Sequence, residues 1–276
     1  MNIIISEYSG YCYGVKKAID TAYNAIEGKN TVYSLGDIIH NKRAVQQLSQ
    51  KGLRVVDDIG EDFDNILFRS HGVEKKHYDF AKKHGIEIID TTCVFVKKIQ
   101  DTVEKSYKDG KKIIIAGDKN HPEVIGINSR CDYTAEFITA GSDIDEIDFD
   151  DRHEYILVFQ TTFNTEKYEE IISWIKKEDR KITLYNTICN ATKKRQDAAV
   201  DLSKKVDMMV VIGDKKSSNS KKLFDLTSKY VRSVFIEDIK ELEKYDFSCI
   251  ETIGVTAGAS TPDFVIDEVT NYLRNI

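Results

Sequence analysis

The sequence predicts an α/β protein built from three pseudo-threefold-related units, each with a small, mostly parallel sheet. One observation is an internal repeat: a cysteine is followed after 24 positions by Gly-Asp, and after 28 positions by His, His or Ser. A second is that an apolar run typical of a buried parallel strand precedes each Gly-Asp. A third is the length, because 276 residues suit two or three lobes of about 100 residues each. Agreement at three fixed offsets favours a divergent triplication.

The repeat defines equivalent residues and unit boundaries. The phase-matched residues are the cysteines Cys12, Cys93 and Cys189, the glycines Gly36, Gly117 and Gly213, and the third positions His40, His121 and Ser217. We expect the units to span residues 12–93, 94–189, and 190–276 together with 1–11. Because no low-complexity linker separates them, we expect them to pack closely.

The chain up to Cys93 is expected to alternate strands and helices. The isoleucines within 2–6 indicate a strand, which belongs to the third unit, and the glycine-containing turn 9–14 leads into a helix over 15–26 in the first unit. The other elements follow from the same apolar runs and polar breaks. They are strands 31–35, 65–69 and 86–89, with helices ending near 51 and covering 77–83.

The second and third units repeat this plan. An amphipathic pattern predicts a helix over 96–107. The second unit adds strands 113–116, 135–138, 155–159 and 182–184, helices near 124 and over 166–177, and an acidic connector over 143–151. The third unit has strands 208–212, 231–236 and 250–255, with helices ending at 204 and covering 240–244 and 262–273. Both prolines, Pro122 and Pro262, lie where a helix is expected to begin and a missing N–H is tolerated.

Composition argues against several classes of protein. The formal net charge is -6 and basic residues are spread along the chain, which argues against a nucleic-acid surface. No run of about 18 apolar residues could cross a membrane. Strand 2–6 follows Met1 directly, so no signal peptide is expected. We therefore expect a cytoplasmic protein whose five cysteines do not form a disulfide framework.

The three phase-matched cysteines are candidate metal ligands. A threefold pseudo-axis would bring them around one point, and each is expected at a helix N-terminus, where the helix dipole favours a thiolate. Soft thiolates favour an iron–sulfur cluster, zinc or Cu(I). Three of them leave one iron of a [4Fe-4S] cluster, or one position on zinc, without a protein ligand. Cys131 and Cys249 match no repeat position and are interpreted as ordinary thiols.

A ring of polar loop residues is expected near the cysteines. Each member opens or precedes a helix, so singly it could cap that helix, whereas the set could bind an anion such as phosphate or diphosphate. The loop 217–219, Ser-Ser-Asn, is especially rich in hydrogen-bond donors. The members are His40, His121 and Ser217 in one phase, and His71, Thr161 and Ser260 in the next.

Glu123 is the one carboxylate in these motif loops without a counterpart in the other copies. Broken symmetry at such a loop indicates a role that is needed only once. A carboxyl group beside His121 suits proton delivery, although a glutamate in the first turn of a helix can also be purely structural.

At these residues the chain resembles the 4-hydroxy-3-methylbut-2-enyl diphosphate reductase family, the last enzymes of the non-mevalonate isoprenoid pathway. The resemblance covers essentially the whole chain and keeps the order of nine motifs. They are Gly-Tyr-Cys12-Tyr-Gly-Val, His40-Asn41, Ser-His71-Gly-Val, Thr-Cys93, His121-Pro-Glu123-Val-Ile-Gly, Gln160-Thr161-Thr162, Cys189-Asn-Ala-Thr192 with Arg195-Gln196, Ser217-Ser218-Asn219-Ser220, and Thr256-Ala-Gly-Ala-Ser260.

The resemblance implies a trefoil of three α/β units around a [4Fe-4S] cluster held by Cys12, Cys93 and Cys189, with the substrate hydroxyl on the open iron. Two protons and two electrons, from an external donor such as ferredoxin or flavodoxin, would convert the allylic substrate to isopentenyl and dimethylallyl diphosphates. Nucleic-acid and membrane partners are not expected. The implied catalytic residues are Glu123, Thr161 and His121, and the implied substrate-binding residues are His40, His71, His121, Thr161, Ser217, Ser218, Asn219 and Ser260.

Two stretches depart from the family pattern. Residues 8–11 read Tyr-Ser-Gly-Tyr where Pro-Arg-Gly-Phe is usual, and residues 91–94 read Thr-Thr-Cys-Val where Ala-Thr-Cys-Pro is usual. These changes affect the approach to the ligands and leave the ligands themselves in place. A different class of interpretation stays open, in which three thiolates and histidines hold zinc in a hydrolase or a cluster in a non-catalytic redox sensor.

Overall fold

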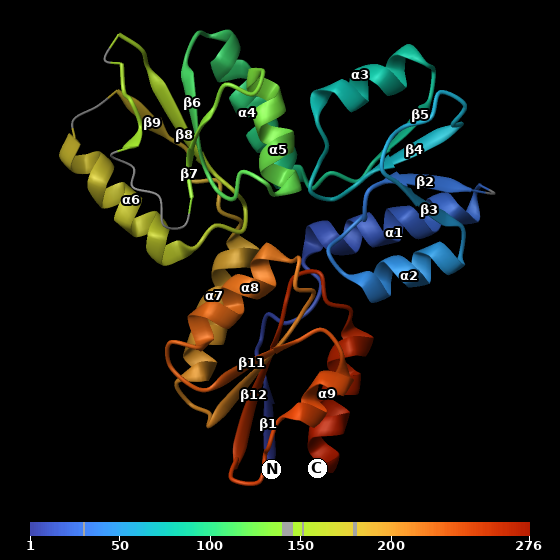
Figure 1. Ribbon diagram of the computed structural model, residues 1–276, viewed down its shortest axis with the longest axis vertical. Coiled ribbons are helices and arrows are strands. Elements are labelled where there is room, and N and C mark those ends of the chain that lie inside the picture. The colour runs from blue at the N-terminus through green and yellow to red at the C-terminus, as the bar shows by residue number, and fades with distance from the viewer. Residues whose placement is uncertain (30, 140–145, 151, 179–180) are drawn as a thin grey trace. The chain divides into compact units, whose positions relative to one another are not determined.

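The computed structural model describes residues 1–29, 31–139, 146–150, 152–178 and 181–276 (Figure 1). By compactness the chain divides into two units. The first compact unit comprises Met1–Lys16, Ile39–Gln50 and Asn190–Ile276, and the second comprises Lys17–Ile38 and Lys51–Cys189.

The second compact unit contains two four-stranded sheets, and every strand pair in them is parallel. One has the order β3-β2-β4-β5 and the other β7-β6-β8-β9. The strands of the first are β2 (Val32–Leu35), β3 (Leu53–Val56), β4 (Asn65–Phe68) and β5 (Glu87–Asp90). Those of the second are β6 (Lys112–Ala116), β7 (Glu136–Ile138), β8 (Tyr155–Phe159) and β9 (Ile182–Leu184).

The first compact unit contains a third parallel sheet with the order β11-β10-β12-β1. Its strands are β1 (Asn2–Ile5), β10 (Met208–Ile212), β11 (Ser233–Ile236) and β12 (Thr252–Ala257). The three orders are equivalent, because β2, β6 and β10 each lie between the next strand of the chain, at the sheet edge, and the strand after that. The fourth position is filled by β5, by β9 and, in this sheet, by β1.

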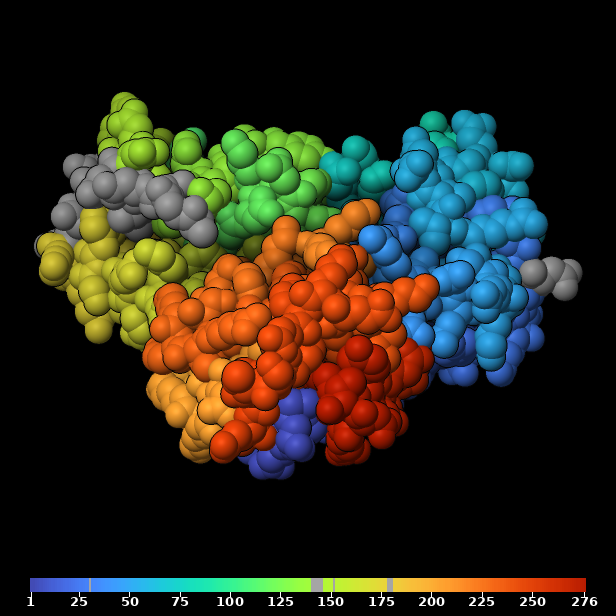
Figure 2. Space-filling model, turned by 60° about the horizontal axis from the view of Figure 1, so that its bottom comes forward, coloured from blue at the N-terminus to red at the C-terminus, as the bar shows by residue number. Residues whose placement is uncertain are grey.

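Figure 2 shows the N-terminal segment that contains β1, in dark blue, at the surface between orange and red segments of the same unit.

Helices alternate with the strands, as the predicted α/β class requires. They are α1 (Tyr13–Glu27), α2 (Lys42–Gln50), α3 (Lys75–Lys83), α4 (Val94–Lys108), α5 (Pro122–Asn128), α6 (Thr165–Glu178), α7 (Asn190–Ser203), α8 (Ser218–Thr227) and α9 (Asp263–Asn275). Two short 3-10 helices are η1 (Ser129–Cys131) and η3 (Ile239–Lys244). None of the helices within the described ranges is both long and apolar enough to cross a membrane.

The central strands carry apolar residues on both faces because helices cover both faces. In β10, Met208, Val210 and Ile212 pack with α9, whereas Met209 and Val211 pack with α7 and α8. Figure 1 shows α7 and α8 on one side of this sheet and α9 on the other. The period of two along a strand explains this division, and the continuous apolar runs of the sequence follow from it.

The strands of the three sheets fall within the expected ranges 12–93, 94–189, and 190–276 with 1–11. The three small parallel sheets are therefore confirmed, while the unit boundaries remain a prediction. The expected helix over 240–244 is present as a 3-10 helix. Pro262, expected in the first turn of the last helix, is instead its N-cap residue, one position before α9. Strand β3 was not predicted, and part of the expected connector 143–151 lies outside the described residues.

Candidate active site

Each phase-matched cysteine lies at the start of a helix, as the sequence predicts. Cys12 precedes α1 and Cys189 precedes α7, while Cys93 is the N-cap residue of α4. All three are partly exposed. The carbonyl groups of Cys12 and Cys93 accept from the N–H groups of Lys16 and Lys97, both at 2.9 Å, which closes the first helical turn. The three thiols thus sit at helix N-termini.

A backbone hydrogen bond holds each of these cysteines to a neighbouring loop. In every case the cysteine N–H donates to the carbonyl of the residue two positions beyond the end of a central strand. The pairs are Cys12 with Ala259 after β12 at 3.1 Å, Cys93 with Ser70 after β4 at 3.0 Å, and Cys189 with Thr161 after β8 at 3.0 Å. The sequence repeat is therefore matched by a repeated backbone contact.

The other two cysteines have different surroundings. Cys131 is fully buried in the core cluster that packs against α4 and α5, and Cys249 is exposed. Burial raises the pKa of the Cys131 thiol to about 11, because the low-dielectric interior disfavours the thiolate. A thiol of this kind is a poor metal ligand at neutral pH, which agrees with the interpretation of Cys131 as a core residue.

Glu123 lies in the first turn of α5 and is 2% exposed. Both oxygens of its carboxyl group accept from Thr161: the N–H reaches Oε1 at 2.6 Å and the hydroxyl reaches Oε2 at 2.7 Å. The two residues come from loops that follow adjacent parallel strands, β6 and β8. Thr161 itself is 8% exposed. The loop residues therefore place a carboxyl group and a hydroxyl group in direct contact within one compact unit.

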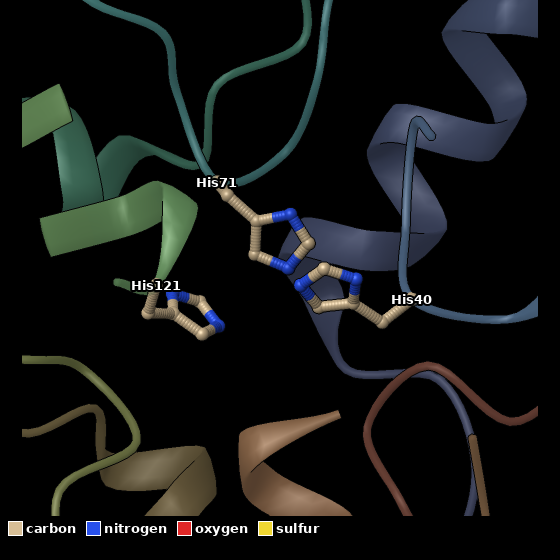
Figure 3. Close-up of side chains that lie close together, drawn as sticks. All are labelled: His40, His71 and His121. Atoms are coloured by element: carbon tan, nitrogen blue, oxygen red, sulfur yellow. The ribbon is translucent and has the colours of Figure 1, made fainter. Parts of the chain in front are cut away.

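His121 caps the helix that carries Glu123. Its Nδ1 accepts from the Glu123 N–H at 3.1 Å, so in the neutral ring the hydrogen is on Nε2, which is then a donor. The His71 ring meets the His121 ring edge to face, with centroids 5.4 Å apart and an interplanar angle of 83° (Figure 3). Capping and ligand binding are thus compatible in His121, because they use different ring nitrogens.

The loop that opens α8 carries a dense set of polar groups. Ser217 is the N-cap residue of α8. Asn219, in the first turn, is 4% exposed, and neither its amide nitrogen nor its side-chain oxygen has a hydrogen-bond partner among the residues that the structure describes. A buried amide without partners is costly unless a ligand supplies them. The N-terminus of α8 therefore fits an anion better than an apolar group.

The sequence-predicted residues divide between the two compact units. The first compact unit contains Cys12, His40, Ser217, Ser218, Asn219 and Ser260. The second contains His71, Cys93, His121, Glu123, Thr161 and Cys189. Within the first unit the Ser260 hydroxyl donates to the His40 carbonyl at 2.8 Å. Ser218 is partly exposed beside Ser217.

Sequence reasoning assigned no role to Arg195. The residue is 3% exposed. Nη1 donates to the carbonyl of Ala257, at 3.1 Å, and to the carbonyl of Tyr8. Arg195 thus joins the end of β12 to the turn that leads into Cys12. The only sequence signal was its place in the Cys189 motif, six residues beyond the cysteine.

Comparison with known proteins places the chain in a family. The family model described as LytB protein matches residues 3–274. A 4-hydroxy-3-methylbut-2-enyl diphosphate reductase of Thermoanaerobacter sp. (strain X514) is 48% identical over 99% of this chain and 97% of its own length. The protein of the same name from Clostridioides difficile (strain 630) is 42% identical, with 100% of both chains covered.

Solved structures agree with this placement. The E-1-hydroxy-2-methyl-but-2-enyl-4-diphosphate reductase from Plasmodium falciparum is 27% identical, with a TM-score of 0.93 over 99% of this chain and 87% of that chain. A solved (E)-4-hydroxy-3-methyl-but-2-enyl diphosphate reductase, the terminal enzyme of the non-mevalonate pathway, is 33% identical with a TM-score of 0.70 over 100% of both chains. From the family match and the full-length relatives we conclude that the chain belongs to the LytB protein family.

Proposed function

We propose that this chain is a 4-hydroxy-3-methylbut-2-enyl diphosphate reductase. The reaction breaks the allylic C–O bond of the substrate with two electrons and two protons. One proton leaves in water with the hydroxyl oxygen, and the other is added to carbon, giving isopentenyl or dimethylallyl diphosphate. The single observation that carries the proposal is the contact of Thr161 with both Glu123 and Cys189, since it joins a proton carrier to a cysteine of the repeat.

The proposal assigns Cys12, Cys93 and Cys189 as the ligands of a [4Fe-4S] cluster in a trefoil arrangement of the three α/β units. The donor set fits, because three thiols at helix N-termini supply soft ligands where negative charge is stabilised. When bound, such a cluster would supply electrons one at a time. With three cysteine ligands, one of its four irons would have no ligand from the protein. A cytoplasmic location accords with this role, since the ligand thiols must stay reduced.

The diphosphate group of the substrate is assigned to the polar loop residues. The Asn219 amide, which has no partner among the described residues, and the N-terminus of α8 offer donors from one compact unit. The Nε2–H of His121 is assigned as a further donor. Imidazole, amide and hydroxyl donors suit the oxygens of a diphosphate. The assigned residues are His40, His71, His121, Thr161, Ser217, Ser218, Asn219 and Ser260.

Glu123 and Thr161 are assigned to proton delivery. Loss of hydroxide is a poor reaction unless the leaving oxygen is protonated, and a positioned acid supplies that proton. In the structure the Thr161 hydroxyl donates to Glu123 Oε2 at 2.7 Å. When Glu123 is protonated, the acid can donate across the same contact, and the Thr161 hydroxyl is then able to turn its own hydrogen outward and pass it on. Because Thr161 N–H also holds Oε1, the carboxyl group cannot swing away from this path.

Turnover tests the proposal directly. The chain is purified without oxygen, its cluster is reconstituted, and it is mixed with reduced ferredoxin or flavodoxin and the allylic diphosphate. We expect isopentenyl and dimethylallyl diphosphates to form while the reduced cluster is reoxidised only in the presence of substrate. Phosphate release without reduction would favour a zinc hydrolase, and a reducible cluster that ignores substrate would favour a redox sensor. Either result would overturn the proposed function.

A further inference from the structure

Ser220 occupies a fully buried position in the first turn of α8. Its hydroxyl lies against two glycines from different loops, Gly213 after β10 and Gly258 after β12. A Cβ atom built on either glycine would lie less than 3.0 Å from Ser220 Oγ, a separation that real Cβ atoms essentially never show. Both glycines therefore leave room for this one hydroxyl group.

The Ser220 hydroxyl is directed at Ser217, the N-cap residue. Ser217 Oγ accepts from the Ser220 N–H at 3.3 Å and from the Ser220 hydroxyl at 3.1 Å. A serine hydroxyl has two acceptor lone pairs and one hydrogen. Since Ser220 uses both lone pairs, the remaining capacity of Ser217 is its hydrogen. Ser217 is thereby fixed as a donor at a helix N-terminus, next to the Asn219 amide, for which the described part of the chain supplies no partner.

We infer that Ser220 is a positioning residue that holds the Ser217 hydroxyl as a dedicated donor to the diphosphate group. The inference rests on the proposed function, because it concerns how that ligand is recognised. A group that only accepts hydrogen bonds, such as an ionised diphosphate, satisfies the site, whereas a neutral group that must also donate does not.

Direct titration with inorganic diphosphate tests this role on the reconstituted protein. Ser220→Ala keeps the Cβ and removes the hydroxyl, so Ser217 regains a lone pair and its hydrogen is no longer directed. We expect diphosphate to bind roughly 12- to 150-fold more weakly, the usual effect of one hydrogen bond to a charged group, with iron content unchanged. Thr227→Val is the matched control, because Thr227 is also fully buried on α8 but donates to the Leu223 carbonyl.

A double variant separates positioning from a general loss of stability. If Ser220 acts through Ser217, adding Ser220→Ala to Ser217→Ala should weaken binding no further. The inference is overturned if Ser220→Ala binds diphosphate like the parent, if its effect persists without Ser217, or if Thr227→Val causes the same loss. If Ser220→Ala loses its cluster, Ser220→Cys, which keeps a weaker donor, replaces it and should show a smaller loss of binding. A parent protein that binds no diphosphate would instead overturn the proposed function.

Discussion

Thr161 binds the Glu123 carboxyl group with both of its donors, the N–H at 2.6 Å from Oε1 and the hydroxyl at 2.7 Å from Oε2. Its carbonyl meanwhile accepts from the Cys189 N–H at 3.0 Å. One residue therefore fixes the position of the carboxyl group assigned to proton delivery and of a cysteine assigned as a cluster ligand. Small movements of this loop would affect both groups together, which makes Glu123 and the three cysteines the most informative positions to change.

Glu123→Gln should abolish proton delivery and leave the site otherwise intact. The amide oxygen can still accept from the Thr161 N–H, and the amide nitrogen can donate to the Thr161 hydroxyl. We expect iron content and diphosphate affinity close to those of the parent, with turnover lower by about 10²- to 10⁴-fold. The measurement is single-turnover product formation with a chemically reduced cluster.

Glu104→Gln is the matched control for this prediction. Glu104 lies on α4 and forms ion pairs with Lys75 and Lys108, outside the motif loops. Its variant should turn over like the parent. Near-normal turnover in Glu123→Gln with a full cluster would remove Glu123 from the mechanism, and loss of iron would make its role structural.

Serine in place of Cys12, Cys93 or Cys189 should cost the protein its cluster. An alcohol is a hard and weakly acidic ligand, so it replaces a thiolate poorly at iron. Iron and sulfide per chain after anaerobic reconstitution measure the effect. Cys131→Ser and Cys249→Ser are the controls and should hold iron like the parent. Equal iron loss from Cys131→Ser would contradict the assignment by repeat phase.

Cys131 should resist alkylation in the folded protein. Its pKa of about 11 leaves roughly one thiol in a thousand ionised at pH 8, and burial adds steric protection. Iodoacetamide at pH 8 followed by peptide mass spectrometry should modify the exposed Cys249 and leave Cys131 unmodified until the chain is unfolded with denaturant. Modification of both at similar rates in the folded protein would show that the thiol is accessible.

Asp90→Asn should loosen the loop before Cys93 in a pH-dependent way. Burial alone would raise the pKa of Asp90, but hydrogen bonds from Lys97 and Thr92 outweigh it and the pKa is lowered. A carboxylate with a lowered pKa stabilises the fold above its unfolded pKa and loses that contribution as the pH falls through its folded value. Lys97 is half exposed, so we expect less than about 1 kcal/mol at pH 7.

Thermal unfolding at several pH values checks the Asp90 prediction. The midpoint of the variant should lie below that of the parent at pH 7, and the difference should shrink as the pH falls from about 5 towards 3. Asp101→Asn, an exposed position on α4, is the control. A constant difference at every pH would assign the effect to packing and not to charge.

The sequence predicts the sheets well because their central strands are buried on both faces and appear as continuous apolar runs. Strand β3 escaped prediction because it lies at the edge of its sheet, and its middle residues Arg54 and Val55 are exposed. The 3-10 helix at 239–244 resembles an α-helix in sequence, and its hydrogen bonding is a local choice that periodicity does not resolve.

Some residues of the candidate site can be predicted from local sequence, and others depend on contacts between segments far apart in the chain. Repeat phase identified the cysteines, because each lies at the same offset from its own Gly-Asp loop. Contacts between distant segments gave no such signal. The fit of Ser220 between Gly213 and Gly258, and the reach of Arg195 to the Tyr8 carbonyl, depend on the folded backbone. Residues that position other residues are therefore the part that only the structure reveals.

Strand β1 pairs Asn2 with Thr252, so the beginning of the chain completes a sheet whose other strands are all encoded near its end. On the ribosome β1 is made before the other strands of its sheet and its partner β12 after them, so the two strands can pair only once β12 has been synthesised. The Cys12 N–H likewise cannot form its hydrogen bond to the Ala259 carbonyl before then, because Ala259 lies beyond β12. The first cysteine to be translated is consequently the last of the three to reach its final backbone position.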